Sequence, residues 1–269
     1  MFKIKEKVIF KMKLNRMKKL GNIKNAIKEF KENKNKNLSY LLEKRFVWMK
    51  KFININEKGL EVGSGGGFSK KYILNKNFKI SDLAMHEHLD IKNLDGEKTG
   101  QKKNSYDFII AVNMIHHVPF PIKFLDEMHR ILKKNGKLII QEAYCSLIFQ
   151  VITIIMRHEG FDFTKDVWNE KLPMSDKKNR WSGNIAVPHL LFDNREKFKE
   201  RFGKKFLIVH NQLSEFFIFL NSGGVTAKTF YIPLNFFILK ILDILDKFLI
   251  KFFPNIFAMG RQIVLKKIN

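Results

Sequence analysis

A short stretch with five glycines limits the folds open to this chain more than any other feature of its sequence. It reads GLEVGSGGGFSKKYI from Gly59 to Ile73, and it places an apolar run, a glycine-rich turn and the start of a predicted helix in succession. Glycine has no Cβ and accepts positive φ, at a cost of roughly 0.5–1 kcal/mol per residue in ordinary secondary structure. We therefore expect a ligand to approach the backbone here.

The spacing of these glycines separates three kinds of ligand site. A P-loop needs Lys and then Ser or Thr directly after its last glycine, whereas Phe68 and Ser69 follow Gly67 here. The dinucleotide fingerprint needs glycine at position 68, so Phe68 disfavours a nicotinamide or flavin site without removing it. The pattern acidic-x-G-x-G-x-G does fit, beginning at Glu61.

The remaining sequence predicts a sheet with helices on its faces. We expect helices within residues 21–53, at 68–74, at 121–136 with Gly136 closing the helix, and at 193–203 with Asp193 as the N-cap. Strands are expected at 58–62, 78–83, 88–91, 106–112, 137–142, 204–210 and 261–267. This alternation is typical of an α/β fold with a doubly wound, mostly parallel, seven-stranded, Rossmann-like sheet.

Two long segments, 146–192 and 212–255, lie outside this alternation. Connections that leave the carboxyl ends of strands lie at the ligand edge of such a sheet, so we expect helical insertions that cap the site. The predicted organisation is an N-terminal helical region (1–53), a cofactor-binding core (54–145), and the remainder of the sheet with its insertions (146–269).

From residue 57 to 143 the chain resembles the class I methyltransferases that use S-adenosylmethionine. Besides the glycine motif, the resemblance rests on an aspartate that ends the second strand, on the stretch VNMIHHV after the fourth strand, and on a fifth strand that ends in Glu142. It implies an enzyme with S-adenosylmethionine as its cofactor. The cofactor-binding residues that it implies are Glu61, Gly63, Ser64, Gly65, Gly67, Asp82, Asp90 and Asn113.

The resemblance also suggests what the acidic residues contact. Glu61 would engage the amino group of the methionine part, Asp82 the two ribose hydroxyls, and Asp90 the adenine amine. A carboxylate at the end of the second strand can bind ribose in either NAD or S-adenosylmethionine.

The catalytic candidates are His116 and His117, which follow the fourth strand at the edge where the methyl group would lie. Methyl transfer needs alignment above all, and a base only if the acceptor holds its proton at neutral pH. Imidazole can be such a base, although the pair could instead shape the backbone or pack on the cofactor. His158 and Glu159 could face the acceptor or form a surface pair, and no metal site is predicted.

The composition bears on location and partners. The formal net charge is +24, which is typical of proteins that bind nucleic acid or an anionic membrane surface, although enrichment in Lys, Asn, Ile and Phe also fits a compositional bias. A single cysteine, Cys145, excludes a disulfide framework and a cysteine-based zinc site and favours the cytoplasm. We interpret it as a buried core thiol. The charged first 20 residues do not read as a secretory signal.

The acceptor is the least constrained part of the prediction. Residues 236–253 predict an apolar helix with a narrow polar stripe, which is either a buried capping helix or a patch on the inner membrane surface. We predict a small-molecule, glycan or lipid-linked acceptor. The alternative is a methyltransferase-like binding protein, or an RNA methyltransferase that uses the basic surface.

Overall fold

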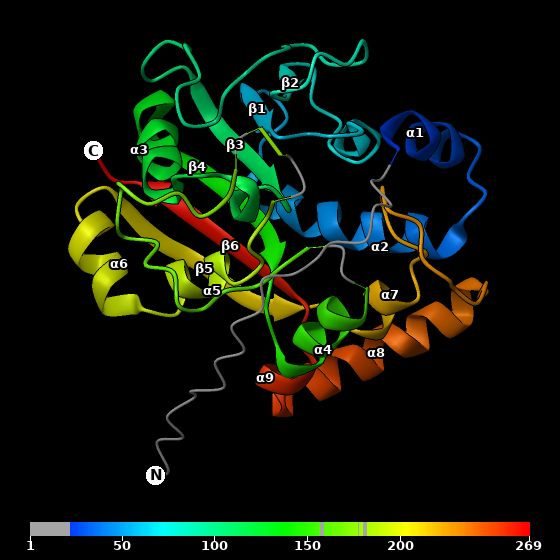
Figure 1. Cartoon of the computed structure of the whole chain (residues 1–269). Helices are drawn as coiled ribbons and strands as arrows, with labels where there is room; N and C mark the ends of the chain where they lie inside the picture. Colours follow the sequence, from blue (N-terminus) through cyan, green and yellow to red (C-terminus); the bar gives the residue numbers. More distant parts are fainter. Residues whose placement is uncertain (1–21, 157–158, 177, 180–181) are drawn as a thin grey trace.

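A sheet of six strands runs through the part of the chain that the computed structural model describes, residues 22–156, 159–176, 178–179 and 182–269 (Figure 1). The strands are β1 (Gly59–Val62), β2 (Phe78–Ser81), β3 (Tyr106–Val112), β4 (Leu132–Ala143), β5 (Phe206–Ser214) and β6 (Gly260–Lys267), in the order β2-β1-β3-β4-β6-β5. Only β6 runs antiparallel to its neighbours, β4 and β5. The predicted α/β, mostly parallel, Rossmann-like fold is confirmed, with one strand fewer.

The strand expected at 88–91 is reduced to one isolated parallel bridge between Ser81 and Ile91. The side chain of Asp90 explains part of this loss. Its Oδ2 accepts the N–H of Ile80 at 2.8 Å, and a backbone carbonyl would take that donor in a regular ladder.

Two predicted helices have different bounds in the structure. The segment after the glycine turn forms only the 3-10 turn η2 (Phe68–Lys71), and α3 (Pro121–Ile131) ends five residues before Gly136. The backbone of Gly136 lies inside the sheet, where a Cβ would be 3.0 Å from the carbonyl oxygen of Asp107. Gly136 therefore permits close packing of two strands and does not cap the helix.

Helices cover both faces of the sheet. One face packs against α3, α5 (Val187–Phe192) and α6 (Arg195–Phe202), around a core that includes Phe124, Phe192 and Phe202. The other face packs against α1 (Ile23–Lys31), α2 (Lys36–Val47) and the 3-10 helix η1 (Trp48–Phe52). The predicted N-cap of α6 is wrong: Asn194 accepts the N–H of Lys197, while Asp193 pairs with Arg261 of β6.

The remaining helices lie in the segments that follow β4 and β5, at the edge of the sheet formed by the carboxyl ends of its parallel strands. The end of β4 at Ala143 pairs with Gly260, which also pairs with Ser214 at the end of β5. From this edge, α4 (Leu147–Met156) follows β4, and α7 (Phe217–Leu220), α8 (Phe236–Phe252) and α9 (Pro254–Phe257) follow β5. The division into three regions stays a prediction, and the first 21 residues of the N-terminal region lie outside the described residues.

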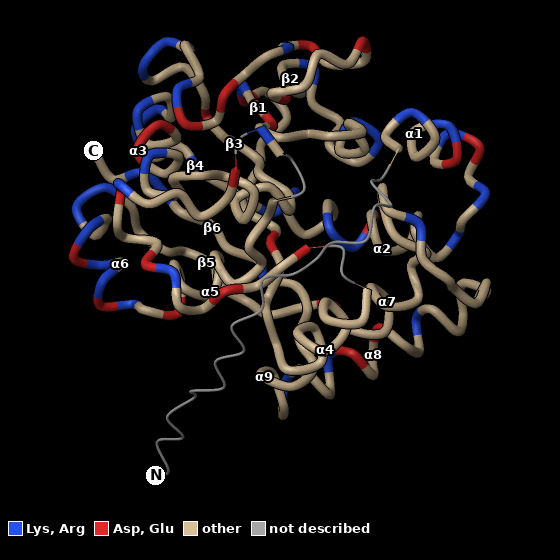
Figure 2. Tube along the Cα trace, in the orientation of Figure 1, with Lys and Arg blue, Asp and Glu red and all other residues tan. Residues whose placement is uncertain are grey.

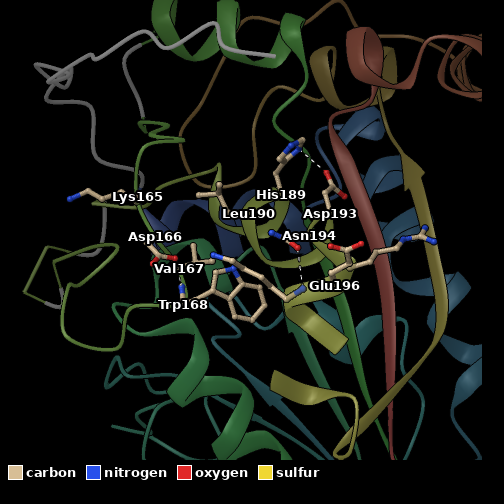
Figure 3. A pocket seen from close by; sticks show the side chains of 11 residues that line it. Lys165, Asp166, Val167, Trp168, His189, Leu190, Asp193, Asn194 and Glu196 are labelled. Atoms are coloured by element: carbon tan, nitrogen blue, oxygen red, sulfur yellow. Dashed lines mark hydrogen bonds and ion pairs between the residues drawn. The ribbon is translucent and has the colours of Figure 1, made fainter. Parts of the chain in front are cut away.

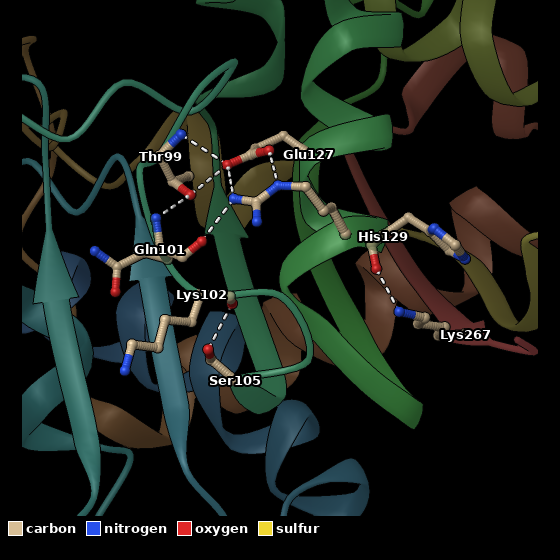
Figure 4. Close-up of polar contacts among 8 residues, drawn as sticks. Thr99, Gln101, Lys102, Ser105, Glu127, His129 and Lys267 are labelled. Atoms are coloured by element: carbon tan, nitrogen blue, oxygen red, sulfur yellow. Dashed lines mark hydrogen bonds and ion pairs between the residues drawn. The ribbon is translucent and has the colours of Figure 1, made fainter.

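The polar loop before β3 is tied to α3 by a network around Glu127 (Figure 4). The Glu127 carboxylate accepts the N–H of Thr99 at 2.8 Å and pairs with Arg130, which also donates to the carbonyl of Gln101 at 2.7 Å. On the far side of α3, the buried ammonium of Lys267 donates to the carbonyl of His129. These contacts support the strand ends opposite the ligand edge.

Candidate active site

The glycine turn leaves β1 and is held against the end of β2. The N–H of Ser64 donates to the carbonyl of Ser81, and the N–H of Gly65 donates to Oδ2 of Asp82, both at 2.9 Å. Gly65 has φ +53°, and a Cβ built there would meet no heavy atom within 4 Å. The turn therefore has open space directly over the backbone of Gly65.

The other two glycines of the motif, Gly63 and Gly67, are required by packing within the protein. A Cβ at Gly63 would lie 2.9 Å from Cβ of Met114, and one at Gly67 would lie 2.7 Å from Cδ1 of Ile80. Among the three glycines of the motif, Gly65 is thus the one whose missing side chain leaves room for a ligand.

Glu61 lies in β1 and is buried beneath this turn. Its carboxylate accepts a hydrogen bond from the hydroxyl of Ser69. Burial raises the pKa of Glu61 to about 7, although the hydroxyls of Ser69 and Ser64 oppose the shift. A ligand ammonium group nearby would favour the ionised carboxylate.

The two aspartates of the predicted cofactor set differ in their partners. Asp82 accepts two backbone N–H groups, from Gly65 and Ala84, and a carboxylate has lone pairs for further donors. Asp90 is bound to β2 through Ile80 and pairs with Lys70 at 2.8 Å. Although burial acts to raise it, the hydrogen bonds from Lys70 and Ile80 hold the pKa of Asp90 below its usual value. The structure thus brings Asp82 to the turn and ties Asp90 to the edge of β2.

His88 contacts the turn and was missed in the sequence analysis. Its Nε2 lies 2.8 Å from the carbonyl oxygen of Gly65, and its ring stacks on that of His86 with a centroid separation of 5.6 Å. The alternating histidines in the stretch MHEHLD were the available signal.

Asn113 follows β3 with φ +48°, and its N–H donates to the carbonyl of Gln141 at 2.7 Å. The chain then turns through Met114, which packs against the glycine turn, into the 3-10 helix η3 (Ile115–His117). This turn places the two predicted catalytic histidines beside the end of β4.

His116 and His117 meet two glutamates. His116 Nδ1 lies 2.7 Å from Oε2 of Glu142, at the end of β4, and its Nε2 lies 3.3 Å from Oε2 of Glu159. His117 Nε2 lies 3.5 Å from Oε1 of the same Glu159. The first insertion therefore contributes Glu159 to this cluster, while His158 lies outside the described residues.

The two histidines differ in their electrostatic environment and in their exposure. Burial acts to lower the pKa of His116, but Glu142 and Glu159 outweigh it and raise that pKa to about 10. The two carboxylates therefore favour the protonated form of His116. His117 has an imidazole that is 28% exposed and is the more accessible member of the pair. Catalysis by either residue stays a prediction.

A buried ion pair at the same edge was also missed. Arg45 of α2 and Glu215, which follows β5, form a bidentate pair at 2.9 and 2.7 Å, and Gln141 donates to the same carboxylate at 3.1 Å. The pair joins the N-terminal helices to the second insertion. No spacing in the sequence connects residues 170 positions apart.

Cys145 is a core thiol, as predicted. It is buried in an apolar cluster with Phe161 and Ile185, and burial raises the pKa of the thiol well above its usual value. A nucleophilic thiolate is disfavoured there.

A cavity of about 800 Å³ lies elsewhere (Figure 3). It is lined by residues 165–168, the end of α5 and the start of α6. The pair of His189 and Asp193, 2.9 Å apart, forms part of its wall. No residue of the glycine turn or of the histidine cluster lines it, so we do not assign it to the cofactor.

Comparisons with known proteins bear on the same part of the chain. Residues 60–140 match the family model described as a methyltransferase domain. Among curated proteins, the chain is similar to "Probable polyketide synthase 10" of Dictyostelium discoideum, with 29% identity over 84 residues that make up 30% of this chain and 3% of that protein.

Among solved structures, the chain is similar to a SAM-dependent methyltransferase from Archaeoglobus fulgidus. The TM-score is 0.51 and the identity 11%, and the match covers 85% of this chain and 94% of that one. At this identity the likeness concerns the fold.

Proposed function

We propose that this chain, which carries a class I S-adenosylmethionine-dependent methyltransferase domain, transfers the methyl group of its cofactor to a lipid-linked acceptor at an anionic membrane surface. The match of residues 60–140 to a methyltransferase domain supports the family and the cofactor that the resemblance implied. The acceptor and the membrane surface are the proposed part.

The residues at the ligand edge suit the transfer step. Methyl transfer from a sulfonium is an in-line displacement, and holding donor and acceptor in line lowers its barrier. The open space at Gly65, with Asp82 and Glu61 around it, would orient the donor. The insertions after β4 and β5 leave the same edge and would orient the acceptor.

The main observation that supports a lipid-linked acceptor is an exposed apolar surface formed by α4, α8 and α9. On α8, the inner positions Leu239 and Ile250 are buried, whereas Phe237 and Ile244 on the outer side are 71% and 66% exposed. Helix α9 contacts both α4 and α8. The exposed apolar residues of the three helices and the residue between α8 and α9 are Leu147, Val151, Ile155, Met156, Phe236, Phe237, Ile238, Ile241, Ile244, Leu245, Phe248, Phe252, Phe253 and Ile256. We call this set the apolar cap face.

Charge complements this face along one side. Lys240, Lys247 and Lys251 recur along α8 next to its outermost apolar positions. Helix α4 has no charged residue and is drawn in tan in Figure 2. Apolar side chains that enter a lipid interface and lysines that meet anionic headgroups are typical of helices that lie on a membrane. No helix among the described residues is long and apolar enough to cross one.

Vesicle sedimentation tests this surface directly. We expect wild-type protein to sediment with phosphatidylcholine vesicles that contain phosphatidylglycerol, and much less with phosphatidylcholine alone. The triple variant Phe237→Ser, Ile244→Ser, Phe248→Ser should lose this binding. Leu74→Ser with Met85→Ser is the matched control, because both residues are more than 70% exposed away from the cap.

Methyl transfer tests the acceptor. With tritiated S-adenosylmethionine and a lipid extract, the label should move into the organic phase, and less of it should move in the triple variant. Label in RNA, or salt-sensitive RNA affinity with no label in lipid, would overturn the proposal in favour of the basic surface. A change of wild-type dimer to variant monomer in light scattering would instead make the apolar cap face a subunit interface.

A further inference from the structure

We propose that His116, His117 and Glu159 form a binding site for a divalent transition-metal ion of the zinc type. The site does not depend on which acceptor the enzyme uses. The three residues come from η3 and from the segment after α4, and one ligand atom from each lies within 4.8 Å of the other two.

The distances fit a small metal. His116 Nε2 and His117 Nε2 lie 3.3 and 3.5 Å from the two carboxylate oxygens of Glu159. In tetrahedral zinc sites the metal–ligand distance is about 2.1 Å, which sets neighbouring ligand atoms about 3.4 Å apart. The two imidazole centroids are 4.1 Å apart. Because the rings lie side by side, both contact the same carboxylate.

Glu142 supplies the support that a metal-binding histidine requires. Its Oε2 lies 2.7 Å from Nδ1 of His116 and also accepts the N–H of Ala143 at 3.0 Å. Glu142 is fully buried, so it holds the His116 ring with Nε2 directed at Glu159. Histidines that bind metals almost always donate the other ring N–H to a carboxylate or carbonyl group.

The first insertion holds both histidines in place from the outside. The N–H of Asn184 donates to the carbonyl of His116 at 2.9 Å, and the hydroxyl of Ser175 donates to the carbonyl of His117. Gly183 passes so close that a Cβ would lie 2.8 Å from Nδ1 of His117 and 2.9 Å from Cδ2 of His116. The cluster is therefore preorganised by backbone contacts on two sides.

Charge and ligand type favour a transition metal over magnesium or calcium. Two imidazoles and a carboxylate suit zinc, iron, cobalt or nickel, whereas magnesium and calcium prefer oxygen ligands. Three protein ligands leave a coordination position open, as in catalytic zinc sites. This position would lie at the same edge of the sheet as the glycine turn proposed to hold the methyl donor, so an acceptor oxygen or nitrogen could occupy it.

Cobalt binding to untagged, chelator-treated protein tests the site without reference to activity. We expect one Co²⁺ per chain, with visible absorption bands of low-symmetry coordination that zinc abolishes by displacement and excess magnesium does not. Glu159→Gln, a change of nearly constant shape, should weaken binding by at least about 100-fold, and Glu142→Gln by about 10–100-fold.

His189→Gln is the matched control, because it breaks another pair of a histidine and a carboxylate, the one with Asp193, and should leave the cobalt affinity unchanged. The proposal is overturned if wild-type protein shows no stoichiometric cobalt spectrum, or if that spectrum persists unchanged in Glu159→Gln. A loss of cobalt binding equal in His189→Gln and Glu159→Gln would also overturn it.

Discussion

The glycine turn and the histidine cluster lie at the same edge of the sheet but are assembled differently. The turn is built mainly from neighbours in sequence, Glu61 to Gly67, with Asp82 closing it from the next strand. The cluster unites η3, the end of β4 and the first insertion through His116, Glu142 and Glu159. The spacing of residues in a local motif indicates the kind of ligand, whereas a cluster of residues distant in sequence can be recognised only in the folded structure.

The largest expected effect concerns the turn. Gly65→Val should abolish binding of S-adenosylhomocysteine, because the side chain would fill the open space over the backbone and would strain a residue at positive φ. Gly100→Val is the control, since Gly100 also has positive φ and open space but lies in the polar loop. Equal loss of affinity in both variants would mean that strain, and not the ligand space, explains the result.

The next largest effect concerns the stability of the contact between α8 and α7, away from the glycine turn. Asp246→Ala should lower the free energy of unfolding by about 3 kcal/mol at pH 7.5, since it removes the buried acceptor of three N–H groups at the start of α7. Asp243→Ala breaks the partly exposed pairs with Lys44 and Lys247 and should cost at most about 1 kcal/mol. Urea denaturation measures both changes in the free energy of unfolding. Equal losses would contradict the role of Asp246 as the buried acceptor at the start of α7.

Two aspartates allow a sharper comparison within the turn. Asp82→Ala should weaken the binding of S-adenosylhomocysteine by roughly 1.5–3 kcal/mol through the loss of charge-assisted hydrogen bonds. Asp90→Ala should have a smaller effect, because its carboxylate is already bound to Ile80 and Lys70. Calorimetric titration measures both affinities. A larger loss for Asp90 would show that the adenine amine, and not the ribose, provides the dominant contact.

The smallest effect is a pH dependence due to Glu61. Burial raises its pKa to about 7 in the free protein, whereas a bound ammonium group would lower it. Binding of S-adenosylhomocysteine should therefore release a proton below pH 7, and the affinity should fall as the pH is lowered from 7 toward the pKa of Glu61 in the complex, by at most about tenfold per pH unit. Calorimetry in buffers with different ionisation enthalpies measures this release. Glu61→Gln should show none, and an unchanged release there would assign the proton to another group.

The sequence was most informative where one short segment determines both backbone and chemistry. The glycine spacing and the apolar runs predicted the turn, the sheet class and the position of Asp82. The bounds of α3 failed because periodicity alone cannot show that Gly136 lies within a strand, where packing against Asp107 decides the conformation. The strand at 88–91 was lost in part because the Asp90 side chain takes the place of a ladder carbonyl.

The histidine cluster shows a different limit. The sequence placed His116 and His117 at the ligand edge, and it named Glu159 as a candidate, but it predicted no metal site. The contacts with Glu142 and Glu159 span 26 and 43 positions along the chain, and no local pattern records such a contact. The same holds for the pair of Arg45 and Glu215.

The central claim is that the open space at Gly65 receives S-adenosylmethionine. Calorimetric titration of the wild-type protein with S-adenosylhomocysteine, and with NAD in a parallel experiment, tests it most directly. The account predicts one S-adenosylhomocysteine per chain and no binding of NAD. Binding of NAD alone, or of neither compound, would contradict it.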